Sequence, residues 1–319
     1  MGEPLRTVYL GSGRFSGDLL NFLLDNGLHI HAVITRPDQP AGRGLRPRPT
    51  AVKTVAEERG LPLFQPHSLP DEMLVKQLVN IKPDFFLVAD YGIKLPQDIL
   101  DLPLRGCLNV HPSLLPRYRG PAPIQRALMD GVKITGVTMM LMDEGLDTGP
   151  IVAQSQIEVS EDANAGFLEK ELARLAAYMI PEVMRGLISG ELVPHLQDES
   201  QATYAEAVRK SEACIDWSLD NRRVHNLIRA LSPTPGAYTY YRNKRIKILR
   251  SKTLSGGGSL KPGEIGVEGK EVMLAGTGEG DLILEVLQPQ GKNTMSAGEF
   301  LRGYRPREGE TFSNTPLTP

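Results

Sequence analysis

Cysteine is scarce in this 319-residue chain, which contains only Cys107 and Cys214. The two cysteines lie far apart, and neither belongs to a Cys-x-x-Cys pair. The sequence therefore argues against a disulfide scaffold and against a zinc site built from cysteines, and we predict no metal site. Such sparing use of cysteine is typical of the reducing cytoplasm, which is where we expect this protein to work.

Long apolar runs are also missing. The first residues, MGEPLRTVYLGSG, contain no apolar stretch of the kind that forms the core of a signal peptide. No other segment has a continuous hydrophobic run long enough to span a bilayer. We therefore expect neither a targeting peptide nor contact with a membrane.

The chain as a whole has no excess of charge of one sign, because its formal net charge is −2. The charge is unevenly distributed, however: it is +5 from Val208 onward and −7 before Val208. A basic C-terminal part favours a polyanionic partner, although a balance of this size is also common on ordinary protein surfaces.

Strand and helix patterns alternate in the first half of the chain. A β-type run over residues 7–10 is followed by a glycine turn, by helical spacing over residues 15–24, and by a β-rich run over residues 28–35. The apolar run over residues 85–89 is typical of a strand buried in a parallel sheet. This order predicts an α/β domain with a Rossmann-like, mostly parallel sheet.

The glycine turn does not carry the dinucleotide fingerprint. Gly11 and Gly13 are followed by the next glycine only at Gly17, one position too far for G-x-G-x-x-G. We therefore expect no nicotinamide cofactor.

Informative polar groups are concentrated between Leu108 and Pro150. Asn109 and His111 are two residues apart, so on a strand both side chains leave the same face. At the carboxyl end of a strand, that face borders the crevice in which open α/β sheets bind ligands. Asp147, in an acidic turn with glycines, is a carboxylate that would orient the imidazole. Such groups are suited to acyl transfer, because an amide and an imidazole donate hydrogen bonds to a developing oxyanion and an imidazole beside a carboxylate carries a proton.

Ordinary structural roles also account for these three residues. A histidine near a strand end is often a satisfied core or surface residue, and Asp147 would equally brace a glycine turn. No serine or cysteine is placed as a nucleophile. If the site is catalytic, direct attack by a substrate amine on an acyl donor therefore fits better than a covalent acyl-enzyme.

The same segment resembles the signature of the formyltransferases that use 10-formyltetrahydrofolate. Asn109, His111 and Asp147 match the catalytic residues of that family, and the string YRGPAPIQRA over residues 118–127 extends the match. The resemblance covers nearly the whole chain and implies 10-formyltetrahydrofolate as co-substrate. It also implies folate contacts in two segments, which contain Ser113, Leu114, Leu115 and Pro116, and Tyr91, Gly92 and Ile93.

Two places depart from the family pattern. The first turn usually resembles GTPxFA, whereas this chain has Gly13, Arg14 and Ser16 there, and we assign no ligand to it. Asp90 stands where alanine is commoner. For Asp90, a cap of the next helix and a contact with ligand are equal alternatives.

Residues 36–53, RPDQPAGRGLRPRPTAVK, form a second distinctive stretch. Its composition predicts an irregular loop rather than a helix or strand. Arginines on such a loop suit phosphate contacts, and a solvated loop without a ligand is the alternative. The stretch resembles the loop that the tRNA-acting branch of the family uses on the acceptor end, with Arg43 matching the arginine most associated with that role. The resemblance implies tRNA contacts by Arg36, Arg43 and Arg46.

The chain changes character after a long amphipathic helix predicted over residues 164–188. We predict a catalytic domain over residues 1–190, a linker over 191–207 and a C-terminal domain over 208–319. Short β-type runs separated by turns predict a small, OB-like β-barrel in the last of these. Arg245 and Lys247 would share one strand face, which suits an RNA backbone and equally suits plain solvation.

These observations lead to one functional hypothesis, formyl transfer from 10-formyltetrahydrofolate to the α-amine of initiator methionyl-tRNA by a monomeric enzyme. By resemblance, Asn109 and protonated His111 stabilise the oxyanion, and Asp147 supports the imidazolium. The alternatives are a formyltransferase acting on an amino sugar or a glycinamide nucleotide, a hydrolase that releases formate, and an RNA-binding protein with an inactive folate fold.

Overall fold

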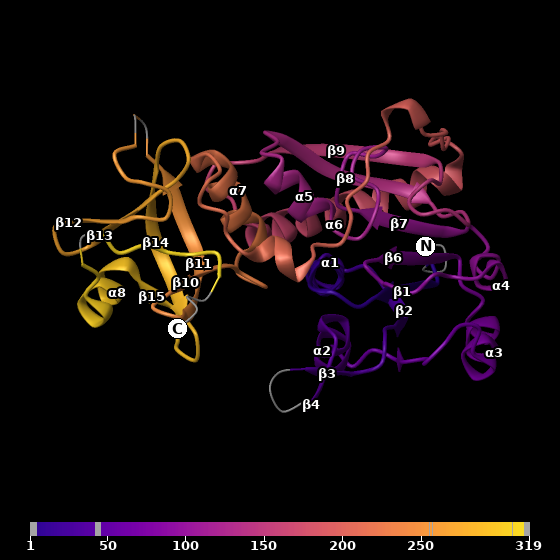
Figure 1. Ribbon diagram of the computed structural model, residues 1–319. Coiled ribbons are helices and arrows are strands. Elements are labelled where there is room, and N and C mark those ends of the chain that lie inside the picture. The colour runs from indigo at the N-terminus through magenta and orange to yellow at the C-terminus, as the bar shows by residue number, and fades with distance from the viewer. Residues whose placement is uncertain (1–4, 42–45, 255, 257, 308, 316–319) are drawn as a thin grey trace. The chain divides into compact units, whose positions relative to one another are not determined.

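The computed structural model describes residues 5–41, 46–254, 256, 258–307 and 309–315, with the backbone alone at residues 41 and 46. The chain divides into two compact units, each discontinuous in sequence (Figure 1). The first comprises Met1–Pro123, Ile134–Glu158 and Glu169–Glu206, and the second comprises Ile124–Lys133, Val159–Leu168 and Ala207–Pro319.

A seven-stranded sheet is the framework of the first unit. Its strands, in their order across the sheet, are β5 (Leu63–Phe64), β2 (Ile30–Ile34), β1 (Thr7–Gly11), β6 (Phe85–Ala89), β7 (Cys107–His111), β8 (Ile134–Leu141) and β9 (Ile151–Glu158). The first five are parallel to one another, and β8 and β9 run antiparallel to their neighbours. The prediction of a mostly parallel, Rossmann-like sheet is confirmed.

The strand order reverses between β1 and β6. The chain runs outward from β1 through β2 to β5 and then returns to the other side of β1 as β6 and β7. In open α/β sheets the ligand crevice lies at such a reversal, outside the carboxyl ends of the strands. Here those ends are Gly11, Ala89 and His111.

Helices pack against the sheet because each has one apolar face. In α1 (Arg14–Asp25) the buried residues include Phe15, Leu19 and Leu23, four apart, which places them on one side of the helix. Leu74 and Leu78 of α3 (Glu72–Ile81) share a core with Val8 of β1, and residues of α4 (Gln97–Leu100) join it. The unit also contains α2 (Ala51–Glu58) and most of α6 (Ala165–Ser189), and α5 (Pro123–Met129) begins at its boundary.

The basic stretch over residues 36–53 is not wholly irregular, so this prediction was wrong in part. Residues Gln39–Ala41 (β3) and Arg46–Arg48 (β4) pair antiparallel as a two-stranded ribbon, with Pro40 opposite Pro47. A proline removes one amide donor from a strand, and an isolated two-stranded ribbon tolerates this loss because its outer edge needs no donors.

The second unit is built on an antiparallel sheet with the order β10-β11-β14-β13-β12, and β15 pairs with β14. Residues Glu310–Ser313 close it: the amide of Ile265, at the start of β12, donates to Glu310, and the amide of Ser313 donates to Tyr240 of β10. Both outer strands are therefore covered, as in the predicted barrel. The elements of this unit are α7 (Asn221–Leu231), β10 (Ala237–Tyr241), β11 (Lys244–Thr253), β12 (Ile265–Glu268), β13 (Val272–Gly276), β14 (Asp281–Pro289), β15 (Met295–Ser296) and α8 (Ala297–Tyr304).

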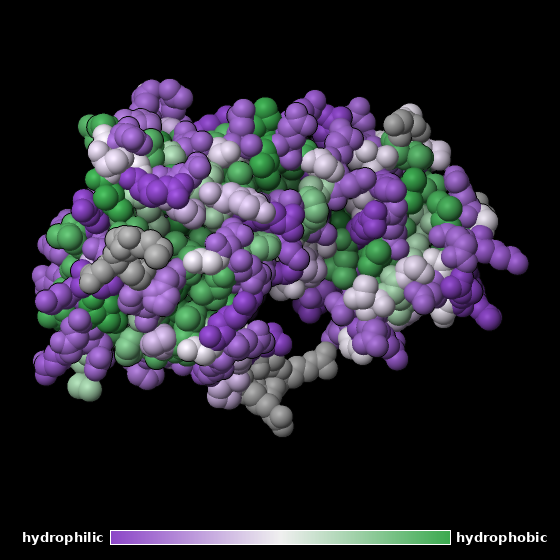
Figure 2. Space-filling view, turned by 180° about the vertical axis from the view of Figure 1, so that it is seen from behind, coloured by the Kyte–Doolittle hydropathy of each residue, from purple (hydrophilic) through white to green (hydrophobic). Residues whose placement is uncertain are grey.

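No helix in the described part of the chain is both long and apolar enough to cross a membrane. In the view of Figure 2, hydrophilic side chains are spread over the surface, with apolar groups scattered between them.

Candidate active site

Asn109 and His111 lie two residues apart near the carboxyl end of β7, so their side chains leave the same face of the strand. Asn109 is opposite Val88 of β6 and Met140 of β8, and His111 is opposite Thr138 of β8. Asn109 is 9% exposed and His111 is 4% exposed. No hydrogen bond joins the amide of Asn109 to any described residue, so this amide is available to a ligand.

The imidazole of His111 is held from both sides. Its Nε2 lies 2.8 Å from the carbonyl oxygen of Tyr118, and a carbonyl only accepts, so Nε2 carries a proton and donates it. Its Nδ1 faces Oδ2 of Asp147 at 3.6 Å, which is an ion-pair distance rather than a hydrogen bond. Nδ1 is thus the ring nitrogen that makes no hydrogen bond within the described residues.

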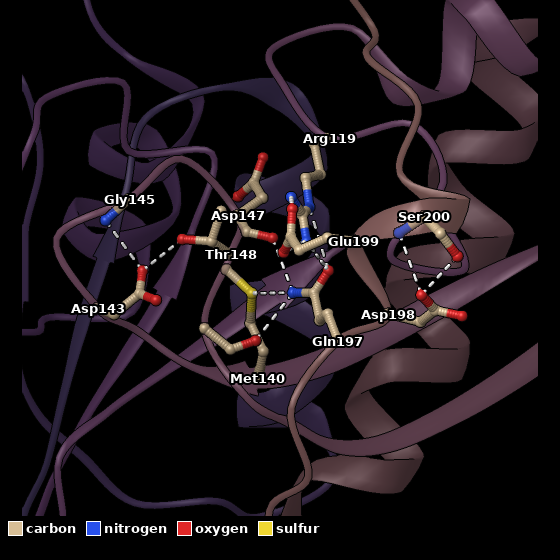
Figure 3. A network of polar contacts seen from close by, with 11 residues as sticks. Arg119, Met140, Asp143, Gly145, Asp147, Thr148, Gln197, Asp198, Glu199 and Ser200 are labelled. Carbon is tan, nitrogen blue, oxygen red and sulfur yellow. Dashed lines mark hydrogen bonds and ion pairs between the residues drawn. The ribbon is translucent and has the colours of Figure 1, made fainter.

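Asp147 is fixed by its own turn. Its φ of 55° lies in the left-handed region, and its Oδ2 accepts a hydrogen bond of 2.8 Å from the amide of Gly120. Asp143 steadies the same turn, since its Oδ1 accepts from the amide of Gly145 at 2.9 Å and from Thr148 Oγ1 at 2.8 Å (Figure 3). The structure therefore brings Asn109, His111 and Asp147 together from β7 and from a turn about 36 residues later in the sequence.

The loop over residues 113–116 is braced internally. Ser113 Oγ donates to the carbonyl of Arg117 at 2.7 Å, so this hydroxyl is occupied within the protein. The amide of Leu115 donates to Thr138 Oγ1 at 3.0 Å, and Gln154 Nε2 donates to the carbonyl of Leu115 at 2.8 Å. Leu115 is buried, whereas Leu114 and Pro116 are half-buried and offer apolar surface.

The second segment assigned to folate by resemblance follows β6. Tyr91 is buried, and its carbonyl accepts a hydrogen bond of 3.1 Å from Ser12 Oγ, so that carbonyl is already used. Gly92 is exposed with φ 75°, and Ile93 is half-buried against the core beside α3 and α4.

A polar network around the buried Arg119, next to the turn of Asp147, was not found from the sequence (Figure 3). Arg119 is 1% exposed, and its guanidinium donates two hydrogen bonds to Gln197 Oε1 (3.1 and 2.8 Å) and two to the carboxylate of Glu199 (2.8 and 2.7 Å). These bonds hold the pKa of Glu199 below its ordinary value. The amide nitrogen of Gln197 donates to the carbonyls of Asp147 and Gly149, both at 2.8 Å.

Residues 197–205, here called the strap, also bind the backbone beside the site. The amide of Arg119 donates to the carbonyl of Thr203 at 2.9 Å, and the amide of Ala205 donates back to Arg119 at 2.6 Å. Thr203 Oγ1 accepts from the amide of Tyr118 at 2.8 Å. The strap lies in the segment that the sequence predicts as a linker, and the presence of Arg119 in the YRGPAPIQRA string was one advance signal for it.

The structure describes the basic residues assigned to tRNA to different extents. Arg43 lies outside the described residues, and of Arg46 only the backbone, in β4, is described. Arg36 is half-buried next to Gly92, at the crevice. In the second unit, Arg245 is exposed 5.3 Å from the ring centroid of Tyr238, and Lys247 is half-buried on the same strand face.

No group of three or more His, Cys, Asp or Glu side chains within the described ranges is arranged to hold a metal ion. Cys107 is buried on β7, and burial raises the pKa of its thiol to about 12, which leaves it protonated and unreactive.

Two family models match the chain, the formyl transferase model over residues 5–184 and the formyl transferase C-terminal domain model over residues 207–305. The chain belongs to the formyl transferase family and is a formyl-transferring enzyme.

Curated proteins similar to this chain over nearly its whole length include methionyl-tRNA formyltransferases. A methionyl-tRNA formyltransferase of Syntrophomonas wolfei subsp. wolfei is 44% identical over 303 residues, which is 94% of this chain and 96% of that protein. The methionyl-tRNA formyltransferase of Carboxydothermus hydrogenoformans is 43% identical over 309 residues, which is 97% of this chain and 99% of that protein.

Solved structures share the fold at lower identity. HypX from Aquifex aeolicus in complex with tetrahydrofolic acid has a TM-score of 0.66 at 20% identity, and the match covers 94% of this chain and 48% of that chain. WlaRD, a sugar 3N-formyl transferase in the presence of dTDP and 5-N-formyl-THF, has a TM-score of 0.64 at 17% identity and covers 92% of this chain and all 100% of that chain.

Proposed function

We propose that this enzyme transfers the formyl group of 10-formyltetrahydrofolate to the α-amine of initiator methionyl-tRNA. The observation that carries the proposal is the convergence of Asn109, His111 and Asp147 at the carboxyl end of β7, where the Asn109 side-chain amide and His111 Nδ1 make no hydrogen bond within the described residues. The folate-bound neighbour of the same fold supports the donor, and the names of the full-length relatives support the acceptor.

The chemistry assigned to these residues is direct acyl transfer. The lone pair of the acceptor amine forms a bond to the formyl carbon, and the carbonyl electrons move onto oxygen as a tetrahedral oxyanion. Collapse of this intermediate re-forms the carbonyl, breaks the bond between the formyl carbon and N10, and leaves N10 to take up a proton. The amine nitrogen loses a proton in return.

Asn109 and His111 stabilise the oxyanion in this scheme. The Asn109 amide donates one hydrogen bond, and Nδ1–H of a protonated His111 donates a second, while Nε2–H remains on the carbonyl of Tyr118. The carboxylate of Asp147, 3.6 Å from Nδ1, offsets the positive charge of the ring. Donors fixed in advance cost no reorganisation when the charge develops, which is why such sites are effective.

The folate lies, in this proposal, against the backbone of residues 91–93 and the apolar side chains of the loop at residues 113–116. Residues 208–319 form the part that binds tRNA, with Arg245 and Lys247 on a strand whose alternate residues Ile246 and Ile248 are fully buried. Arg36, Arg43 and Arg46 contact the acceptor end. We propose a monomer as the active form.

The acceptor test separates this proposal from its alternatives. The protein is incubated with 10-formyltetrahydrofolate labelled in the formyl group and with methionyl-tRNA, glycinamide ribonucleotide or a dTDP-linked amino sugar. We expect label on methionyl-tRNA alone. Transfer to one of the small amines, or release of labelled formate without an acceptor, would overturn the proposal.

A further inference from the structure

Asp90 lies at the reversal of strand order, where open α/β folds bind their ligands. It directly follows β6, and its backbone carbonyl accepts hydrogen bonds from the amides of Ser12 (3.1 Å) and Gly13 (3.4 Å) in the turn after β1. Its φ of 43° is in the left-handed region, which a residue with a Cβ adopts at a cost in free energy. Strained backbone of this kind is concentrated at functional sites. Asp90 does not cap the next helix, because Pro96 precedes α4.

The side chain of Asp90 occupies space that only a glycine leaves open. A Cβ atom at Gly13 would lie 1.6 Å from Oδ2 of Asp90, far inside any non-bonded contact. Both positions depart from the family pattern, so the two departures coincide in space. The turn at Gly13 leads into α1, and the N-terminus of a helix usually attracts an anionic ligand. Here a carboxylate of the protein itself lies there, so this turn offers a negative group to a cationic part of a ligand.

The carboxylate of Asp90 has no partner within the described part of the chain. Neither a hydrogen bond nor an ion pair within 4.0 Å joins it to another described side chain, and the residue is open to solvent. Loss of hydration nevertheless raises the pKa of this carboxyl group to about 6, against a smaller lowering effect of Arg36. The carboxylate is therefore open to solvent on one side and close to protein atoms on the other.

Arg36 supplies unpaired donors nearby. Its Nη1 would lie 3.1 Å from a Cβ atom at Gly92, so the guanidinium lies beside the residue two places after Asp90. Its Nε is buried without a hydrogen-bond partner in the described structure, and so is the hydroxyl of Tyr91. A buried polar group left unpaired costs free energy, so a ligand that supplied partners to these two groups would be favoured.

The reaction offers one ligand with the required charge. The folate donor carries no cation, whereas an aminoacyl acceptor presents an α-ammonium group, whose ordinary pKa is roughly 7.7–8.0, beside an ester carbonyl that accepts hydrogen bonds. We propose that Asp90 binds this α-ammonium group and takes one proton from it, while Arg36 donates to the adjacent ester carbonyl. The inference rests on the proposed function and adds a residue for the acceptor, which Asn109, His111 and Asp147 do not provide.

The proton transfer is balanced. The ammonium group gives one proton to the Asp90 carboxylate, which leaves a neutral amine and a neutral carboxylic acid. The lone pair freed by this step is the one that attacks the formyl carbon. The acid later returns its proton to solvent.

The test compares Asp90→Asn with Asp98→Asn, which removes an exposed carboxylate in the same stretch of chain. Initial rates are measured against methionyl-tRNA concentration at saturating 10-formyltetrahydrofolate, and the affinity for 5-formyltetrahydrofolate is measured by calorimetry. For Asp90→Asn we expect kcat/KM for the acceptor to fall roughly ten- to hundredfold, as for loss of a charge-assisted hydrogen bond. The folate affinity should stay within about twofold, and Asp98→Asn should match the unmodified enzyme.

Two results would overturn the inference while leaving the proposed function intact. One is an acceptor kcat/KM for Asp90→Asn equal to that of Asp98→Asn. The other is a loss of folate affinity as large as the loss in kcat/KM, which would place Asp90 on the donor. If the unmodified enzyme fails to formylate methionyl-tRNA, the proposed function fails first and the inference fails with it.

Discussion

The amide nitrogen of Gln197 donates to the carbonyls of Asp147 and Gly149, and the amide oxygen of the same side chain accepts two bonds from the buried guanidinium of Arg119. A single glutamine thus uses both donors and its acceptor to fix the turn that carries Asp147. Arg119 in turn sets the position of the neighbouring Tyr118 and Gly120, whose carbonyl and amide hold His111 and Asp147.

Gln197→Ala should therefore loosen Asp147 without touching either substrate. Two carbonyls and a guanidinium lose partners, so we expect the free energy of unfolding to fall by about 1–3 kcal/mol and kcat to fall more than KM rises. Gln201→Ala is the control, because within the described residues that side-chain amide donates to Asp198 alone, on the surface. Denaturant unfolding and steady-state kinetics measure the two effects. Equal behaviour of the two variants would show that the network does not support the site.

Asn109→Ala should remove one oxyanion donor. We expect kcat to fall on the order of 100- to 1000-fold, which corresponds to roughly 2.7–4 kcal/mol of barrier. The affinity for 5-formyltetrahydrofolate should persist, because the amide is assigned to the transition state. Asn80→Ala, on the exposed side of α3, should behave as the unmodified enzyme. Near-normal turnover of Asn109→Ala would contradict the assigned role.

Asp90 should make stability depend on pH. Its pKa, raised from 3.8 to about 6, means that the folded protein holds this proton more tightly than the unfolded chain, so the ionised group lowers stability above pH 6. The ionisable groups that interact with it electrostatically are Tyr9 and Arg36. Asp90→Asn should unfold at a higher temperature than the unmodified protein at pH 8, and the gap should shrink as the pH falls through 6 toward 4. A gap that is constant with pH would contradict the raised pKa.

Arg43→Ala should mainly weaken the use of charged tRNA. If its guanidinium binds a phosphate, the slope of log KM for methionyl-tRNA against log salt concentration should fall by about 0.7–0.9, the contribution of one phosphate contact. The folate affinity should not change. Lys76→Ala removes an exposed cation from α3 and serves as the control for net charge. An equal loss of folate affinity in Arg43→Ala would count against the assignment.

The sequence predicted best those elements whose signal is local. The apolar run predicted over residues 85–89 matches β6, and the long helix predicted over residues 164–188 differs from α6 by one residue at each end, because local hydrophobic patterns and flanking turns decide both. Helix α8 was missed, although Ser296 and Glu299 form a capping box whose pattern is visible in the sequence. Its two glycines, Gly298 and Gly303, obscured the helical pattern.

The sequence predicted the chemical groups of the site but not what holds them. Asn109 and His111 are two residues apart, so a strand alone aligns them. Gln197 lies 50 residues from the Asp147 carbonyl that it binds, and no periodicity reports a contact of that range. The ribbon of β3 and β4 was also missed, because its pairing holds despite prolines that local propensity counts against strands.

The contact between Gly13 and Asp90 makes the place of one residue depend on the other. A Cβ at position 13 would lie 1.6 Å from the Asp90 carboxylate as it stands, so the aspartate would have to turn to another rotamer, whereas a glycine leaves its present place open. The position of the acid beside this turn therefore depends on the glycine. Relatives with an acidic residue at the second position are therefore expected to carry glycine at the first, and the reverse need not hold.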